Sequence, residues 1–209
     1  MRKKKSQISS IIKEEITNNI KPYIIITIIF LSGIFMGVLF INKTDTKSDI
    51  EKYINTYIDE TKMIQNGDYL IEISKEIKSD IILTVLLWFA GTTIIGIPIV
   101  LGIILFRGFC LGYTISACIM SLGKIKGIVF ILTTTLLQNI IFIPAIIVLG
   151  VSSIKLYKSI IKDRRKENIK ISILKHSIIT MMVLISFIIA SIIKIEVSYR
   201  LIINLIKYF

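Results

Sequence analysis

Few residues in this sequence have side chains that could do catalytic or metal chemistry. The chain contains one histidine, His176, and two cysteines, Cys110 and Cys118. His176 lies where a basic segment meets an apolar one, so we interpret it as an interfacial residue rather than a ligand or a base. Both cysteines lie in apolar sequence, which favours small buried residues over a disulfide or a metal site. There is no P-loop, GxSxG, HExxH or CxxC motif. The sequence therefore predicts no catalytic, cofactor-binding or metal-binding residue.

A second group of polar side chains interrupts a long apolar run. Gln138 and Asn139 lie inside the run at 127–151, with three threonines just before them and Pro144 after them. An amide buried in hydrocarbon without a partner costs several kcal/mol, so both side chains must face other helices. Two interpretations stay open: interhelical hydrogen bonds, which contribute about 0.6–2 kcal/mol each, or a site that binds a substrate.

A third local pattern combines a charge with two glycines. Arg107 follows an apolar run, and we expect it to reach the interface as a cytoplasmic anchor. Gly108 and Gly112 have the spacing that lets helices approach closely in lipid. We predict that Gly108, Gly112, Gln138, Asn139 and Pro144 form the structural centre of the protein. No apolar run contains a carboxylate, which argues against a proton- or cation-coupled transporter.

The elements that must position these residues are transmembrane helices. The chain has 209 residues, of which 54% are hydrophobic, and its mean hydropathy is +0.77. A membrane span needs about 20 apolar residues at a rise of about 1.5 Å each. Five runs fit or approach that length: residues 23–41, 81–106, 109–122, 127–151 and 177–193. The third run is short and could instead be a re-entrant or tilted segment. The first run is longer than the core of a signal peptide, which predicts an uncleaved span. We expect an all-α polytopic bundle of about five spans, forming a single membrane domain over residues 1–209.

The charged segments predict how the bundle is oriented. The basic N-terminus at 1–21 and the basic connection at 152–176 carry net charges of +4 and +6, whereas the segment at 42–80 carries −3. Because short basic loops stay in the cytoplasm, we predict a cytoplasmic N-terminus, an extracytoplasmic loop at 42–80 and a C-terminus outside. The amphipathic tail at 194–209 is expected on a membrane surface. The net charge of +12 then reflects topology, or attraction to anionic lipid, rather than nucleic-acid binding.

The segment at 42–80 is the largest surface predicted outside the membrane. Its apolar residues recur at helical spacing, which favours an amphipathic helix. Tyr53, Tyr57 and Tyr69 lie in it and are candidate partner-binding residues, because tyrosine is enriched at protein interfaces. A plain solvated loop is the alternative interpretation.

Two motifs give a resemblance to a known family. FRGFCLGYT at 106–114 and LQNIIFIPA at 137–145 are similar to the signature regions of the stage II sporulation protein M family. The resemblance covers nearly the whole chain, including Gly33 and Gly37 in the first run and the Gly96–Pro98 element. The sequence departs from the family pattern at Leu137, where a proline is frequent.

The resemblance implies a function in endospore formation. It implies a non-enzymatic membrane scaffold that acts in engulfment, in the mother-cell membrane around the forespore. The implied partners are stage II sporulation proteins D and P, which degrade peptidoglycan outside the membrane. The residues alone also allow a different class, a permease component of a transporter that uses a separate ATPase. In that case Gln138, Asn139 and the broken spans would line the transport path.

Overall fold

The computed structural model describes residues 20–43, 52, 56, 69–93, 95–132, 135, 137–162 and 166–206. Within these residues the chain is helical, which confirms the predicted all-α class. The helices are α2 (Ile20–Lys43), α4 (Tyr69–Thr92), α5 (Gly96–Leu122), α6 (Lys124–Ile131), α7 (Leu137–Lys162) and α8 (Lys166–Ile206).

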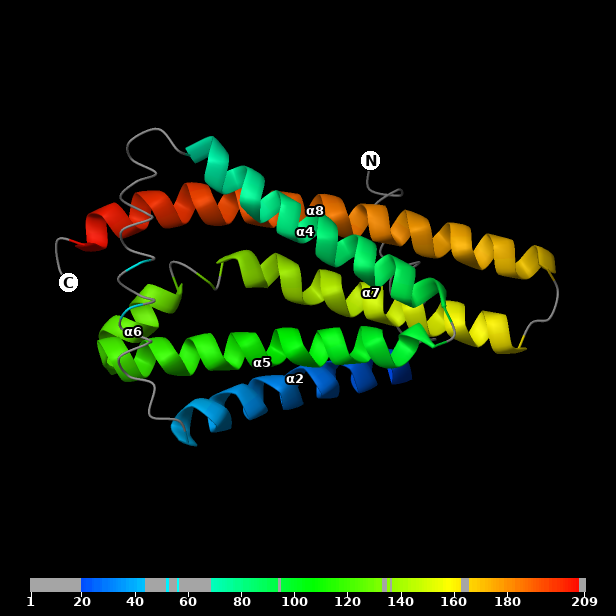
Figure 1. Ribbon diagram of the computed structural model, residues 1–209, viewed down its shortest axis with the longest axis horizontal. Coiled ribbons are helices and arrows are strands. Elements are labelled where there is room, and N and C mark those ends of the chain that lie inside the picture. Colours follow the sequence, from blue (N-terminus) through cyan, green and yellow to red (C-terminus); the bar gives the residue numbers. More distant parts are fainter. Residues whose placement is uncertain are drawn as a thin grey trace, which may run out of the picture.

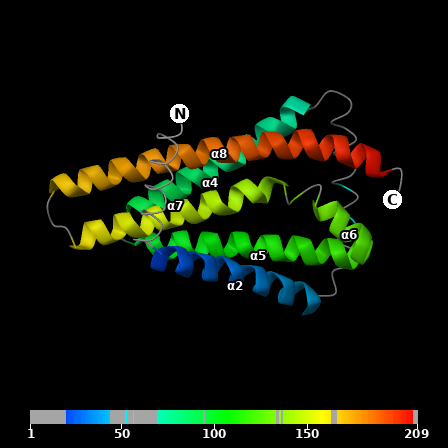
Figure 2. The ribbon, with the colours of Figure 1, turned by 180° about the vertical axis from the view of Figure 1, so that it is seen from behind.

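The five long helices lie side by side along the long axis of the molecule, and successive ones run in opposite directions (Figure 1). One end of the bundle, called here the basic end, holds the start of α2, the α4–α5 turn, and the adjoining ends of α7 and α8. The other end, called the α6 end, holds α6, Lys43, Tyr69 and Ile206. The view from behind shows the same arrangement (Figure 2).

Four helices among the described residues are long and apolar enough to cross a membrane, which makes this a multi-pass membrane protein. They are Ile20–Ile41, Gly96–Leu122, Gln138–Ile161 and Ile169–Glu196. The fifth long helix, α4, is polar in its first half and apolar from residue 81 onward. Five spans and a cytoplasmic N-terminus stay predictions.

The predicted break at Arg107 and Gly108 is wrong. Residues 96–122 form one helix of 27 residues, so 109–122 is the second half of α5 rather than a separate short span. The run at 81–106 is broken earlier, where the Thr93 N–H and hydroxyl both donate to the Ala90 carbonyl, at 3.2 and 3.0 Å. Pro98 is tolerated in the first turn of α5, because a helix leaves those N–H groups without a carbonyl partner.

The polar segments also contain helix. In segment 152–176, predicted as a connection, residues 152–162 form the last turns of α7 and residues 166–176 the first turns of α8. Residues 194–206 continue α8 without a break. Tyr53 and Tyr57 lie outside the described residues, and Tyr69 is the first residue of α4.

The core lies between all five long helices. It includes buried residues of α2, α4, α5, α7 and α8: Ile26, Phe30, Leu87, Ile104, Ile146, Leu149 and Phe187. Phe142 and Phe187 stack with ring centroids 4.2 Å apart. Large apolar side chains also cover the outside, such as Phe35 at 64% exposure and Phe89 at 66%. An apolar outer surface is expected of a bundle surrounded by lipid.

Candidate functional site

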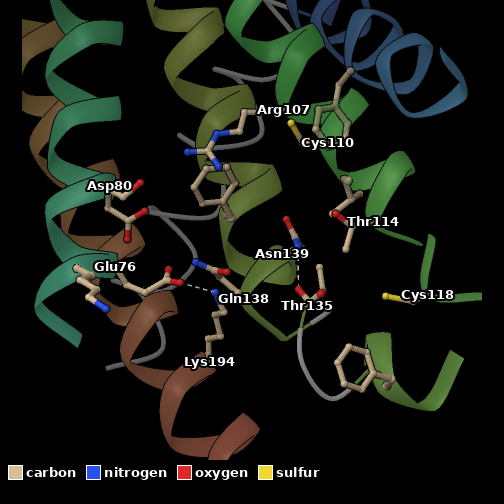
Figure 3. A pocket seen from close by; sticks show the side chains of 16 residues that line it. Glu76, Asp80, Arg107, Cys110, Thr114, Cys118, Thr135, Gln138, Asn139 and Lys194 are labelled. Atoms are coloured by element: carbon tan, nitrogen blue, oxygen red, sulfur yellow. Dashed lines mark hydrogen bonds and ion pairs between the residues drawn. The ribbon is translucent and has the colours of Figure 1, made fainter. Parts of the chain in front are cut away.

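An open pocket of about 430 Å³ lies between α4, α5, α7 and α8, and Phe30 of α2 and Phe130 of α6 also line it (Figure 3). Its lining is unusually polar for a membrane domain. Sixteen residues surround it: Phe30, Lys75, Glu76, Ser79, Asp80, Arg107, Cys110, Leu111, Thr114, Cys118, Phe130, Thr135, Gln138, Asn139, Phe142 and Lys194. Cavities of about 300–1,000 Å³ with a few convergent polar groups are typical of small-molecule sites.

Asp80 is the most deeply placed acid of the pocket. It is 4% exposed, and the Ser191 hydroxyl donates to its Oδ2 at 2.6 Å. The Gln138 amide in turn donates to the Ser191 oxygen at 3.2 Å. This chain of hydrogen bonds joins α7 through α8 to α4, so the amide predicted to face other helices contacts α8. A hydroxyl that donates to a carboxylate makes one of the stronger hydrogen bonds in proteins.

A second acid, Glu76, lies one helical turn before Asp80 on α4. Its Oε1 is 2.6 Å from Nζ of Lys194 on α8. The two side chains are 26% and 20% exposed, so this ion pair lies at the rim of the pocket rather than in the core. It neutralises one positive and one negative charge of the lining.

Arg107 extends its guanidinium into the pocket from the middle of α5 (Figure 3). The guanidinium carbon lies 5.1 Å from the centroid of the Phe142 ring, a cation–π contact. Among the described residues, no hydrogen bond or ion pair joins the guanidinium to a protein group. We expected Arg107 to end a span and reach the interface, but the structure places it within a continuous helix, facing the bundle interior.

Asn139 lines the same pocket close to the start of α7. Its Nδ2 donates to the Thr135 carbonyl at 2.7 Å, which leaves the amide oxygen as an acceptor. Pro144 lies inside α7, one turn and more beyond Asn139, and does not line the pocket. The structure thus brings Arg107, Gln138 and Asn139 together and leaves Pro144 out.

Gly108 and Gly112 lie elsewhere, at the contact between α5 and α2. A Cβ added at Gly108 would overlap the Phe30 carbonyl oxygen, and one at Gly112 would overlap that of Ile34. Gly33 and Gly37 on α2 stand in the same relation to the backbone of α5. The four glycines therefore let two helix backbones touch, which side chains would prevent.

His176 is buried, at 1% exposure, whereas we expected it at the membrane interface. It lies near the basic end, far along α8 from the pocket, and its Nδ1 is 2.8 Å from the Ser152 hydroxyl. Its Nε2 has no hydrogen-bond partner among the described residues and faces Gly91 of α4. His176 thus connects α4, α7 and α8. A side chain larger than glycine at position 91 would collide with the His176 ring.

Cys110 and Cys118 are free thiols that both line the pocket; Cys118 is buried and Cys110 is partly exposed. Within the described ranges, no cluster of three or more His, Cys, Asp or Glu side chains could hold a metal ion.

Sequence reasoning missed Glu76, Asp80, Ser191 and Lys194. Glu76, Asp80 and Lys194 flank apolar runs and look like loop or boundary residues in a hydropathy profile, and Ser191 is a small residue near the end of the run at 177–193. The available signal was the spacing of Glu76 and Asp80, which lie four residues apart and so share one face of a helix that continues into the apolar run at 81.

The apolar outer surface, the four long apolar helices and the internal charged pocket define a polytopic helical membrane protein. Comparison with known families makes this specific. The family described as Stage II sporulation protein M matches residues 26–197, and the chain belongs to that family. No curated protein and no solved structure matches the chain.

Proposed function

We propose that this protein is a non-enzymatic membrane scaffold of endospore formation, which localises peptidoglycan-degrading partners during engulfment of the forespore. Family membership supports a role in sporulation. By resemblance, the partners are stage II sporulation proteins D and P, and the location is the mother-cell membrane around the forespore.

The observation that carries the proposal is the separation of the two ends of the bundle. Lys43 and Tyr69, which bound the segment predicted to meet partners, lie at the α6 end together with the end of α8 (Figure 2). The adjoining ends of α7 and α8, with the basic segment 152–176, lie at the other end. If the basic end is cytoplasmic, as the charge rule predicts, the α6 end faces the peptidoglycan.

Close packing of α2 on α5 favours a rigid scaffold over a protein whose helices move during function. The two helices touch through backbone atoms at four glycines, so sliding one past the other would separate them. A stiff support of this kind can hold the ends of the 42–80 segment at a constant spacing, which favours binding of a partner by that segment.

The test is affinity purification of the tagged protein from detergent-solubilised membranes of sporulating cells. We expect peptidoglycan hydrolases to co-purify, and Tyr53→Ala with Tyr57→Ala to reduce their recovery. Thr56→Ala is the matched control, because Thr56 lies between them in the sequence and its hydroxyl donates locally, to the Lys52 carbonyl at 2.9 Å. Unchanged recovery in the double variant would remove the tyrosines from the proposal, and recovery of a cytoplasmic ATPase without hydrolases would contradict the scaffold.

The charged pocket favours the second candidate, a permease component. The sequence argued against ion coupling because no apolar run contains a carboxylate, but Glu76 and Asp80 do line an internal cavity. A transport path needs such polar groups inside the bundle. Deletion of an ATPase encoded nearby should reproduce the phenotype of deleting this protein under this hypothesis alone.

A further inference from the structure

The strongest sign of a ligand site is an arginine that has no hydrogen-bond or ion-pair partner among the described residues. Arg107 lies mid-helix in α5, where a charge is costly unless it faces partners or a water-filled cavity. Its guanidinium has five N–H donors in a fixed plane. Its described contacts are the face of the Phe142 ring and a longer-range electrostatic interaction with Asp80, neither of which accepts those hydrogen bonds. The Arg107 side chain lines the cavity, so its N–H donors are available to a ligand there (Figure 3).

A negative charge lies on another wall of the same cavity. Asp80 is held by Ser191 through one carboxylate oxygen, Oδ2, and it lines the cavity. Arg107 and Asp80 are not joined as an ion pair, although they come from neighbouring helices and their side chains lean toward one another (Figure 3). Glu76 and Lys194 already pair with each other, and Lys75, the remaining charged residue of the lining, has an interaction of its own. Arg107 and Asp80 are therefore the opposite charges that we assign to a ligand.

We propose that this pocket binds a small zwitterion, with its anionic oxygen group on Arg107 and its ammonium group on Asp80. A planar guanidinium binds a carboxylate or phosphate through two parallel hydrogen bonds. The Asn139 side chain donates to Thr135 through Nδ2, and its amide oxygen is an acceptor that adds a second partner for an N–H group of the ligand.

Charge complementarity selects a zwitterion over simpler ions. A plain anion would lie close to the carboxylates of Asp80 and Glu76, and a plain cation would lie close to Arg107. A zwitterion satisfies both walls at once, and the volume of about 430 Å³ admits an amino acid, a short peptide or a zwitterionic lipid headgroup. The proposal does not depend on the scaffold function, because a scaffold can carry a ligand site and a permease requires one.

Cys110 supplies a reporter inside the pocket. The experiment uses the full-length Cys118→Ala protein in phosphatidylglycerol nanodiscs, which contain no ammonium group, and follows the rate at which a small maleimide labels Cys110. Dialanine is the soluble zwitterion, and acetate and methylamine are its two half-molecules. We expect dialanine to slow labelling about tenfold at about ten times its dissociation constant, and the half-molecules to leave the rate unchanged.

A second arm separates a soluble ligand from a lipid. Nanodiscs that contain phosphatidylethanolamine present a phosphate and an ammonium without added dialanine. If dialanine slows the labelling of Cys110, the ligand is a soluble zwitterion. If phosphatidylethanolamine slows it without dialanine, the ligand is the lipid headgroup. No slowing in either arm, or equal slowing by acetate, overturns the proposal.

Variants tie protection to the two charges. Arg107→Gln and Asp80→Asn should each abolish protection, whereas Lys158→Gln, an exposed change near the basic end and outside the pocket, should preserve it. Arg107→Lys keeps the charge but loses the two-point contact, so protection of Cys110 should become weaker without disappearing. If Arg107→Gln fails to fold, Arg107→Lys takes its place in the test. Full protection in both Arg107→Gln and Asp80→Asn would overturn the assignment of the pocket. Because hydrolase recovery does not enter this readout, failure here leaves the scaffold proposal standing.

Discussion

Gly108→Ala tests how the bundle is held together. A Cβ at this position of α5 would overlap the backbone carbonyl oxygen of Phe30 on α2. A carbonyl inside a helix cannot rotate away as a side chain can, so the two helices must separate or tilt. Gly102, earlier in the same helix, has open space where a Cβ would stand. Gly102→Ala is therefore the matched control, with the same chemical change and no collision.

The magnitude follows from these two environments. A methyl group forced into a packed interface destabilises by about 1–3 kcal/mol. The gain in helix propensity from glycine to alanine is common to both positions of α5, so it cancels in the comparison. The two variants should therefore differ by about 1–3 kcal/mol in free energy of unfolding. By the scaling of soluble domains of this length, that corresponds to about 2–12 °C in Tm.

The assay is thermal unfolding of the purified protein in detergent, in a Cys110→Ala background because Cys110 is partly exposed. Unfolding is followed by circular dichroism and by reaction of the buried Cys118 thiol with a fluorogenic dye. Gly108→Ala should unfold and expose the thiol at the lower temperature. Midpoints for Gly108→Ala and Gly102→Ala within about 2 °C of each other would refute the reasoning, since the α2–α5 contact would then tolerate a side chain.

Three further predictions concern the pocket and the topology. Ser191→Ala removes the hydroxyl that donates to Asp80, and the free energy of unfolding should fall by about 1.5–3 kcal/mol, because the acceptor is a buried carboxylate; an unchanged Tm would contradict this. A double-mutant cycle of Glu76→Gln and Lys194→Gln should give a coupling energy of only about 0.2–1 kcal/mol, since both side chains are partly exposed, and a value well above that range would show a shielded pair. In a cysteine-free background, Ile160→Cys should react with a membrane-impermeant thiol reagent in inverted vesicles, and labelling from outside intact cells would overturn the predicted orientation.

Hydropathy predicted the class of fold well and two helix boundaries poorly. The first and fifth apolar runs fall within α2 and α8. The fourth run, predicted as one span over 127–151, is instead divided between α6, which ends at Ile131, and α7, which begins at Leu137. Arg107 and Gly108 looked like a break because charge and glycine usually end a span. Here the charge faces a polar cavity and the glycine faces a carbonyl of α2, so both fit within a continuous helix. The true break at Thr93 has no charge, and it depends on hydrogen bonds back to Ala90 that a hydropathy profile does not contain.

The candidate site was only half visible in the sequence. Gln138 and Asn139 stood out because amides are rare in apolar runs, and Arg107 stood out as a lone charge. Asp80 and Lys194 did not, because each lies at the edge of an apolar run where charged residues are ordinary. Their position inside the bundle results from α4 and α8 continuing past the apolar runs as unbroken helices.

The sequence by itself determined that this chain is a multi-pass helical protein of the membrane, because run length and helical rise must match the thickness of the bilayer. It also determined the asymmetry of charge that predicts orientation. Only the tertiary structure decided which polar groups meet. Ser191 and Asp80 lie 111 residues apart, and their contact depends on how α4 packs against α8. A one-dimensional pattern records the face of each helix but not its neighbour, so the charged pocket exists only once the bundle has formed.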